Sequence, residues 1–302
     1  MKRLQIDHVT DYQFGAVVTL LPHRLLLRPR ENHYLRLVSS TLDISPAYRI
    51  RWQRDVRDNS VAVITFADRA DALRIASTVV IEHYEEAPLD FLVEDFAVRH
   101  PFQYLAHDVL DLAPFCTPTW PSDRAEVMNW LASIALGSGP IETFLLLDRL
   151  NHAIHDRFRY KVREAPGVQS PRATIALGSG SCRDFAALFT ESCRHLGLAS
   201  RFVTGYNLSS YADVGDGSTH AWAEVYLPGP GWKGFDPTAG VVAGSSHIAV
   251  AVAHHPETVP PVAGSFLRQE NLSPKMHVTV RVREVAAGAA VEPKKASSDT
   301  PD

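Results

Sequence analysis

The sequence predicts an α+β protein in which an antiparallel β domain comes first and a core of helices and strands follows. Alternating apolar residues dominate the first 86 residues, as expected for half-buried strands. After residue 121, apolar residues instead recur at the three-to-four spacing of helices, behind residues that favour helix starts. Five prolines between residues 87 and 121 separate the two patterns, because proline interrupts regular elements.

These patterns divide the chain into four parts. We expect a β domain over residues 1–90, a connecting segment over 91–120, an α+β core over 121–285 and a disordered tail over 286–302. The tail lacks aromatic residues, which a packed segment of this length would need.

The composition bounds the class of protein. With 302 residues, 45% hydrophobic and 21% charged, and a net charge of -4, the chain is typical of a globular protein. There is no basic excess to bind nucleic acid, no apolar run near the ~18 residues of a membrane span, and no secretory pattern. We therefore expect a cytoplasmic protein without nucleic-acid or membrane partners. The three cysteines show no CxxC spacing, so free thiols are expected.

Particular stretches give the expected elements. Residues 48–52 and 61–66 flank the turn-rich 57–60, which predicts a hairpin. Helices are expected at about 122–136, 140–158 and 182–196, and a loop at 159–177. Strands are expected at 198–208, 220–227, 232–236 and 276–283, with a polar loop at 209–219 that borders the active site.

Cys182 is predicted to be the first residue of a helix. Ser181 and Asp184 have the spacing of a capping box, just before an apolar run. The unpaired amides and the helix dipole at such a position favour a thiolate over a thiol. Gly178 and Gly180 are expected to let the backbone approach a ligand closely. The alternative is that Cys182 is only a small buried apolar residue, as many free cysteines are.

His220 and Asp236 complete a possible nucleophile, base and orienting acid. A five-residue loop would pair Val225 with Gly231 and place His220 directly opposite Asp236. A tighter turn would leave the two residues out of step. Each residue alone has a simpler explanation, since histidines occur in half-buried strands and aspartate before proline is common in turns.

In three blocks the sequence resembles the transglutaminase-like superfamily. The family motifs Gly-x-Gly-x-Cys-x-Asp-Phe-Ala, His-Ala-Trp-x-Glu-Val and Trp-x-x-Phe-Asp-Pro-Thr correspond here to residues 178–186, 220–225 and 232–238. Residues 8–12 and 20–30 also resemble the N-terminal β domain of bacterial transglutaminase-like cysteine peptidases. The resemblance covers about residues 1–240. It implies a papain-like α+β core, a Cys-His-Asp triad, and protein crosslinking, amide hydrolysis or peptidase activity.

The resemblance and the mechanism together give a candidate site. Cys182, His220 and Asp236 are the expected catalytic residues, and the backbone amide of Cys182 and the side chain of Tyr160 are the candidates to bind the oxyanion. Trp222, Asp184 and Trp232 are expected around the pocket. Arg183 stands where the family often has glutamine, which would change the substrate rim. The chemistry needs no metal or organic cofactor, and although some transglutaminases use calcium, the sequence has no EF-hand-like loop.

The leading hypothesis is a cysteine-dependent hydrolase of peptide or γ-glutamyl-type amides that acts through a thioester. An acyltransferase that passes the acyl group to an amine is the alternative within catalysis. A catalytically idle peptide-binding module is the alternative of another class, but it predicts a damaged triad, whereas all three residues are present. A zinc enzyme is disfavoured because no ligand pair has metal-site spacing.

Overall fold

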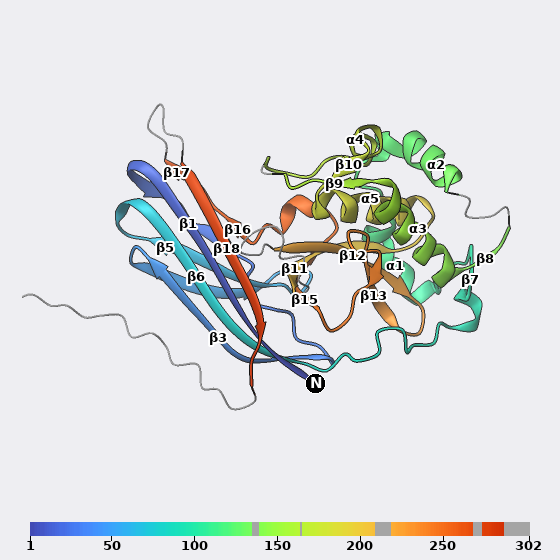
Figure 1. The fold of residues 1–302 in the computed structure, drawn as a ribbon, viewed down its shortest axis with the longest axis horizontal. Helices are drawn as coiled ribbons and strands as arrows, with labels where there is room; N and C mark the ends of the chain where they lie inside the picture. Colours follow the sequence, from blue (N-terminus) through green and yellow to red (C-terminus); the bar gives the residue numbers. More distant parts are fainter. Residues whose placement is uncertain (135–138, 164, 209–218, 268–273, 287–302) are drawn as a thin grey trace, which may run out of the picture.

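The computed structural model describes residues 1–134, 139–163, 165–208, 219–267 and 274–286. Figure 1 shows a β lobe, which contains both the first strands (blue) and the last strand (red), beside a lobe of mixed helices and strands. The predicted α+β class, with antiparallel sheet at the N-terminus, is confirmed. No helix in the described ranges is long and apolar enough to cross a membrane.

The β lobe contains two antiparallel sheets. One has the order β17-β1-β6-β3, with β18 also paired to β1, and the other has the order β16-β2-β5-β4. Leucine, isoleucine and phenylalanine side chains from both sheets form one buried cluster. The strands are β1 Lys2–Leu20, β2 His23–Leu25, β3 Leu35–Ser45, β4 Tyr48–Arg54, β5 Ser60–Phe66, β6 Arg69–His83, β16 Val262–Ala263, β17 Phe266–Leu267 and β18 Lys275–Glu284.

The mixed lobe is built on a five-stranded antiparallel sheet with the order β14-β13-β12-β11-β15. Its strands are β11 Ser200–Asn207, β12 His220–Leu227, β13 Gly231–Asp236, β14 Val241–Val242 and β15 His247–Ala253. The helices are α1 Ala106–Cys116, α2 Arg124–Ser133, α3 Thr143–Arg157, α4 Pro171–Leu177 and α5 Cys182–His195, with 3-10 turns η1 Asp95–Ala97, η2 Pro121–Asp123 and η3 Pro256–Thr258. Two short strand pairs join β7 Arg99–His100 to β8 Ile141–Glu142, and β9 Arg159–Tyr160 to β10 Ser179–Gly180.

Helix α5 is the centre of the mixed lobe. It packs against β12 and β11 on one side and against the other α-helices elsewhere, so nearly all of its residues are buried. Even polar side chains of this helix are enclosed, and its two longest charged ones have partners. Glu191 accepts backbone N–H groups of Thr119 and Trp120 at 3.0 and 2.9 Å, and Arg194 donates to the Ser200 carbonyl at 3.0 Å. Buried polar groups need such bonds, and these hold α5 in one position.

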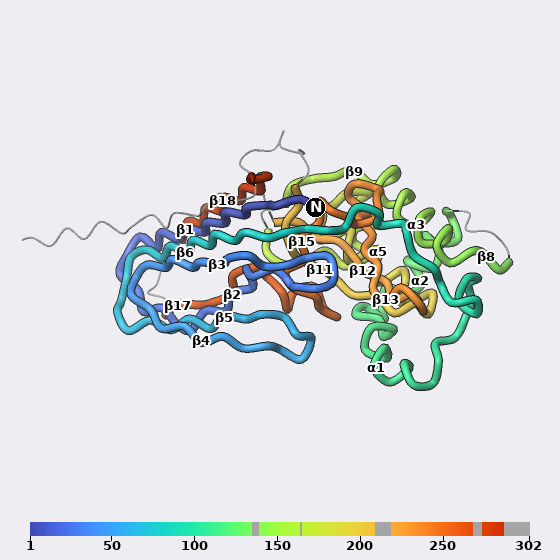
Figure 2. The backbone as a smooth tube through the Cα atoms, turned by 90° about the horizontal axis from the view of Figure 1, so that it is seen from below, coloured from blue at the N-terminus to red at the C-terminus, as the bar shows by residue number. Residues whose placement is uncertain are grey.

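The two lobes share an apolar interface and a polar clamp. Leu4, Ile6 and Ile81 of the β lobe belong to the same buried cluster as Phe202 and Ile248 of the mixed lobe. Figure 2 shows β1 and β6 side by side, running towards the mixed lobe.

The clamp is Asn59, which is fully buried in the turn between β4 and β5. Its side chain donates to the Val252 carbonyl at 2.8 Å and accepts the Val252 N–H at 2.9 Å. Val252 lies on β15, the edge strand of the sheet, so Asn59 satisfies backbone groups that an edge leaves unpaired.

The C-terminal strands correct the expected domain limits. The predicted strand at 276–283 is present as β18, but it pairs with β1 of the β lobe, with Val282 opposite Ile6. The strands β16 and β17 join the β lobe as well. The core expected to reach residue 285 therefore ends before these strands. The alternating pattern of residues 276–283 predicts a strand, but it does not tell which other strand this one pairs with.

Helices α1 and α4 lie in segments that we expected to be a connector and a loop. Pro114 lies inside α1, although prolines in that segment suggested breaks. Pro171 sits in the first turn of α4, where proline is tolerated, and the Ser170 hydroxyl accepts the Ala173 N–H at 3.3 Å. The predicted hairpin of residues 48–66 is confirmed by the pairing of β4 with β5. The predictions for the loop at 209–218 and the tail at 287–302 lie outside the described residues.

Asn59→Ala is expected to lower the free energy of unfolding by roughly 3 kcal/mol, because it leaves two buried backbone groups of Val252 without partners. Urea unfolding followed by tryptophan fluorescence measures the change. The matched control is Asp58→Asn in the same turn, where φ is 59° and asparagine is tolerated. The control should stay within about 0.5 kcal/mol of the wild type. An unchanged unfolding curve for Asn59→Ala would contradict the clamp.

Candidate active site

Cys182 is the first residue of α5, as the sequence predicts, and its side chain is half-buried. The capping box is present: the Asp184 carboxylate accepts the Ser181 N–H at 2.8 Å and the Ser181 hydroxyl at 2.9 Å. Because the first-turn amides of a helix lack intrahelical acceptors, the Cys182 N–H and the positive end of the dipole both face the thiol region. The chain thus places a sulfur where a negative charge is favoured.

The two glycines before Cys182 have structural roles. Gly178 ends α4 in the left-handed conformation, with φ 58°, which glycine adopts without strain. A Cβ at Gly180 would lie 2.7 Å from the Cβ of Asp184, so only glycine fits beside the cap. A helix end and close packing against Asp184 account for the two glycines, and the expectation that they let a ligand approach stays a prediction.

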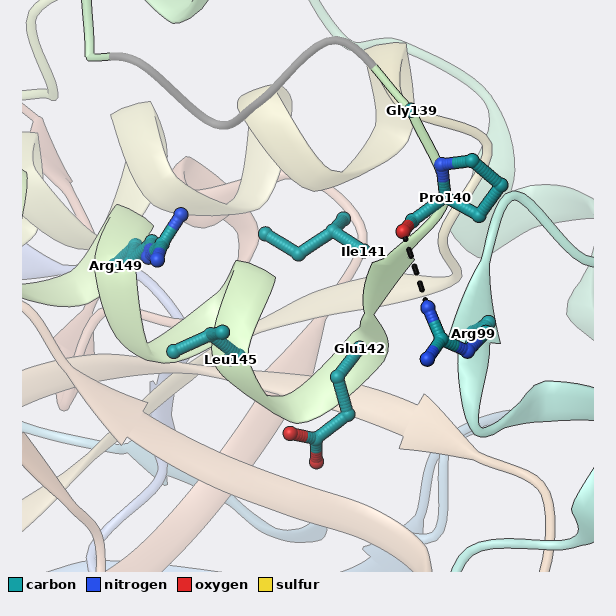
Figure 3. A pocket seen from close by; sticks show the side chains of 7 residues that line it. All are labelled: Arg99, Gly139, Pro140, Ile141, Glu142, Leu145 and Arg149. Atoms are coloured by element: carbon teal, nitrogen blue, oxygen red, sulfur yellow. Dashed lines mark hydrogen bonds between the residues drawn. The ribbon is translucent and has the colours of Figure 1, made fainter.

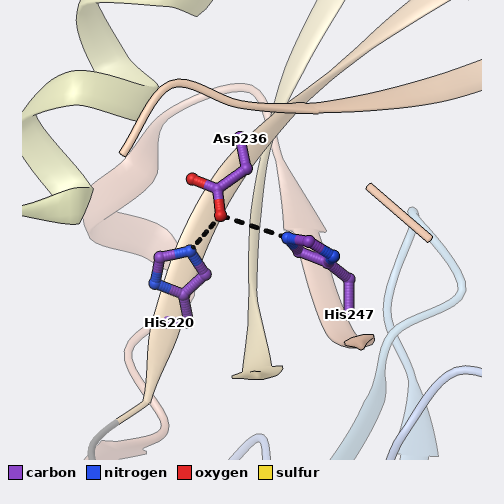
Figure 4. Close-up of side chains that lie close together, drawn as sticks. All are labelled: His220, Asp236 and His247. Carbon is purple, nitrogen blue, oxygen red and sulfur yellow. Dashed lines mark hydrogen bonds and ion pairs between the residues drawn. The ribbon is translucent and has the colours of Figure 1, made fainter. Parts of the chain in front are cut away.

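His220 and Asp236 are directly bonded. His220 begins β12 and Asp236 ends β13, and the His220 Nε2 lies 2.7 Å from the Asp236 Oδ2 (Figure 4). The register differs from the expected one, because Leu227 pairs with Gly231 across a tight turn and Val225 pairs with Lys233. Continued along the strands, this register puts Asp236 opposite Trp222. The two residues therefore meet diagonally, which histidine is long enough to do.

Cys182 is close enough to act on the pKa of the His220 ring together with Asp236, so the ring has the thiol as well as the carboxylate as a neighbour. Burial alone would lower the pKa of the ring, but the hydrogen bonds and charges of Asp236 and Cys182 prevail and raise it to about 10. The Asp236 side chain is fully buried, which opposes its charge, yet bonds from His220 and His247 hold its pKa well below the usual range. The arrangement therefore favours a charged imidazolium beside a carboxylate.

Tyr160 lies at the same end of α5. Strand β9 pairs in parallel with β10, and this register sets Tyr160 beside Gly180, two residues before the thiol. Burial, and next the charge of Cys182, raises the pKa of the phenol to about 12. Tyr160 therefore stays protonated at neutral pH and can donate a hydrogen bond. Its role as an oxyanion donor remains a prediction.

The residues expected around the pocket occupy other positions. Asp184 is fully buried and bonded to Ser181, to the Gln169 N–H at 2.7 Å and to Arg163 at 3.1 Å, so it is a structural cap without a free face for substrate. Trp222 is 2% exposed and stacks beside the His220 ring, with ring centroids 6.1 Å apart.

Trp232 lies at the start of β13, under the Arg201 guanidinium and edge-on to Phe115. Trp222 and Trp232 line a cavity of about 120 Å³ between the lobes, which His83 and His247 also line. Their expected place around the substrate stays a prediction.

His247 is the residue of this cluster that sequence reasoning missed. Its Nε2 lies 3.1 Å from the same Oδ2 of Asp236 that His220 contacts (Figure 4). His247 begins β15, a strand that we did not predict because the segment after residue 240 is rich in alanine, valine and proline. The alternating run after His247 was the available signal, but it gave no indication of the strand's partner.

The described residues bring together one trio that could hold a metal ion, namely His220, Asp236 and His247. Their ligand atoms lie within 4.8 Å of one another. Chain spacing could not reveal this trio, because its members come from three different strands. In the structure the three atoms already bond to one another, each imidazole to one carboxylate oxygen, so protein contacts alone account for the arrangement.

A larger hollow of about 370 Å³ lies elsewhere, between β7, β8 and α3 (Figure 3). Arg99 donates to the Pro140 carbonyl at 3.3 Å on its wall, and Arg149 and Glu142 also line it. None of the residues around Asp236 contributes to this hollow. The candidate site around Asp236 therefore lies apart from this hollow.

Comparisons with known proteins agree with this architecture. Residues 4–82 match the bacterial transglutaminase-like N-terminal region, and residues 139–237 match the transglutaminase-like superfamily. An uncharacterized protein of Mycobacterium leprae is 34% identical over 279 residues, which cover 88% of this chain and 94% of the relative. An uncharacterized protein of Mycobacterium tuberculosis is 27% identical over 281 residues, covering 87% of both chains.

Among solved structures, a candidate cysteine protease from Cytophaga hutchinsonii superposes with a TM-score of 0.74 at 18% identity, over 95% of this chain and 91% of that chain. At this identity the match shows a shared fold. Both lobes, and not only the mixed one, are included in this similarity and in the match to the Mycobacterium leprae protein. The chain therefore belongs to the transglutaminase-like superfamily, with a bacterial transglutaminase-like N-terminal region ahead of its core.

Proposed function

We propose that the protein is a cysteine-dependent hydrolase that cleaves amide bonds of peptides or γ-glutamyl-type conjugates through a thioester on Cys182. The observation that carries this proposal is the position of the His220 ring, which is bonded to Asp236 at 2.7 Å and close enough to Cys182 for that side chain to shift the pKa of the ring. A nucleophile, a base and an acid that orients the base are the groups that acyl transfer requires. The superfamily membership and the shared fold support the same chemistry.

The reaction begins with proton transfer within the site. The raised pKa of His220 favours an imidazolium at neutral pH, with the thiol proton passed to the ring. The sulfur attacks the amide carbonyl carbon and forms a C–S bond. The C–N bond then breaks as the imidazolium proton passes to the nitrogen, and the amine leaves.

Hydrolysis completes the cycle. His220, now neutral, takes a proton from water, and the oxygen attacks the thioester carbon. The C–S bond breaks, a carboxylic acid is released, and the sulfur returns to thiolate beside the imidazolium. Asp236 keeps its charge throughout and holds the ring so that Nε2–H faces the carboxylate and Nδ1 remains for the thiol side.

Two donors are available for the charge that develops on the carbonyl oxygen. The Cys182 N–H is in the first turn of α5, where amides lack intrahelical partners. The Tyr160 hydroxyl, kept protonated by its raised pKa, is the second donor that we propose. Fixed donors of this kind stabilise an oxyanion without reorganising in the transition state.

Cys182 is expected to react with iodoacetamide at neutral pH at least about tenfold faster than Cys116 or Cys193, because only the thiolate is the nucleophile. Cys116 is the matched control, since it is also half-buried but burial raises its pKa. Cys193 is fully buried, and burial raises its pKa further. Site-resolved mass spectrometry gives the three rates. In urea, where the protein is unfolded, the three cysteines should react at similar rates. Similar rates in the folded protein would contradict the proposed activation of Cys182.

The His220 ring is expected to stay protonated through neutral pH and to lose its proton near pH 10. Removing a neighbouring negative charge destabilises the imidazolium and therefore lowers the pKa of His220. Cys182→Ala and Asp236→Asn should therefore each lower the midpoint towards the ordinary histidine value. NMR titration of the labelled ring nitrogens measures it. A wild-type midpoint below that of ordinary histidine would exclude the ion pair.

Cys182→Ala and His220→Ala are expected to abolish turnover of peptidyl aminomethylcoumarin amides and γ-glutamyl para-nitroanilide. Asp236→Asn should leave residual activity, with kcat reduced by up to about 10⁴-fold, because orientation is lost and the nucleophile remains. Cys116→Ala, a thiol outside the site, should match the wild type. Circular dichroism confirms that each variant is folded.

The same assay separates hydrolysis from transfer. With a primary amine at millimolar concentration, mass spectrometry compares the free acid with the new amide. We expect free acid to dominate. Dominant amide would assign the acyltransferase alternative, and activity retained in Cys182→Ala would remove the mechanism altogether.

A further inference from the structure

We propose that His247 is a positioning residue for the triad, and that the β lobe holds His247 in place through His83. This inference rests on the proposed function, because it concerns how Asp236 is kept in the orientation that His220 needs. Neither histidine would touch the reacting atoms. Their effect would pass through the Asp236 carboxylate.

The carboxylate of Asp236 is held at both oxygens. Its Oδ1 accepts the Thr238 N–H at 2.9 Å. Its Oδ2 contacts the Nε2 of His220 at 2.7 Å and that of His247 at 3.1 Å. A carboxylate with one anchored oxygen can still tilt about its terminal torsion, which is broad. The bond from His247 fixes the oxygen that also orients His220.

The hydrogen bonds around His247 decide its tautomer. The Gly244 N–H donates to the His247 Nδ1 at 3.3 Å, and the Ser246 hydroxyl lies 3.1 Å from the same nitrogen. A neutral ring that accepts at Nδ1 carries its proton on Nε2, which lies 3.1 Å from the Asp236 Oδ2 and 3.4 Å from the Asn207 side-chain nitrogen. That proton faces the Asp236 Oδ2. The ring is buried and packs edge-on against Trp222, with centroids 5.2 Å apart and an interplanar angle of 75°. The orientation of the ring and the position of its proton therefore both direct the His247 Nε2–H towards the Asp236 carboxylate.

His83 has a similar hydrogen-bond pattern and lies further from the site. The Glu85 N–H donates to the His83 Nδ1 at 3.3 Å, which leaves the Nε2 proton for the His247 carbonyl, also at 3.3 Å. His83 is the last residue of β6 and is buried between the lobes. A chain of contacts thus runs from the β lobe through the backbone of His247 and its ring to Asp236. This gives the N-terminal lobe a part in organising the active site.

The substitution series uses the shape of glutamine, whose amide nitrogen can take the place of the histidine Nε2. His247→Leu removes the donor and should lower kcat by roughly 10- to 100-fold, as loss of a partner that orients an active-site group typically does. KM should change less than twofold, since no substrate contact is lost. His247→Gln should restore most of kcat. His83→Leu should reduce kcat about two- to tenfold, and His83→Gln should restore it.

Two readouts separate this proposal from the proposed function. Turnover of γ-glutamyl para-nitroanilide reports on catalysis, while the iodoacetamide rate of Cys182 needs no substrate and reports on the thiol–imidazole pair. We expect the alkylation rate to fall in His247→Leu and to recover in His247→Gln. If the wild type lacks Cys182-dependent turnover, the proposed function fails, but the alkylation series still tests His247.

Three results would overturn the positioning role. Wild-type kcat and alkylation rate in folded His247→Leu would show that Asp236 needs no second histidine. Equal losses in His247→Leu and His247→Gln, in step with their melting temperatures, would indicate packing alone. Activity lost to a chelator and restored by zinc would reassign the trio as a metal centre. If His247→Leu does not fold, the His83 pair carries the same comparison.

Discussion

The structure depends on one buried negative charge, the carboxylate of Asp236. A buried charge without partners is strongly unfavourable, so the fold must supply donors to both of its oxygens. Those donors come from the turn after β13, from the start of β12 and from the start of β15. Satisfying this carboxylate therefore fixes the relative positions of three segments. The same requirement brings the histidine ring towards the first turn of α5.

Helix α5 joins this polar centre to the apolar core. Its first turn presents the thiol, and the following turns place Phe185 and Phe189 against Phe235 and the other residues of the mixed-lobe cluster. Because Phe235 is the neighbour of Asp236, packing of the helix on the sheet and placement of the carboxylate are parts of one arrangement. A helix displaced from the sheet would separate the sulfur from the ring. The relative positions of the Cys182 sulfur and the His220 ring therefore depend on how the apolar core packs.

Local chemistry explains what could be predicted from the sequence. The capping box at Ser181 and Asp184, the start of α5 at Cys182 and the hairpin of β4 and β5 rest on neighbouring residues, and the structure contains all three. Features that rest on distant partners were missed. His247 meets Asp236 only because β15 pairs with β11, and β18 joins the β lobe only because β1 has a free edge there. The register of the hairpin formed by β12 and β13 was also not predicted. It depends on the length of the turn near residue 229, and the glycines and prolines there are compatible with more than one length.

The pairing of β18 with β1 governs the order in which the molecule can form. Ile6 lies opposite Val282, so this contact joins residues nearly the whole chain apart, and the mixed lobe is an insertion within the loop that the contact closes. Contacts of such sequence separation form late, because loop-closure entropy must be overcome first. On the ribosome, the helices and β11 to β15 emerge before β18 does. The β lobe is thus begun first and completed last, and during synthesis the mixed lobe is the earlier of the two to have all of its strands.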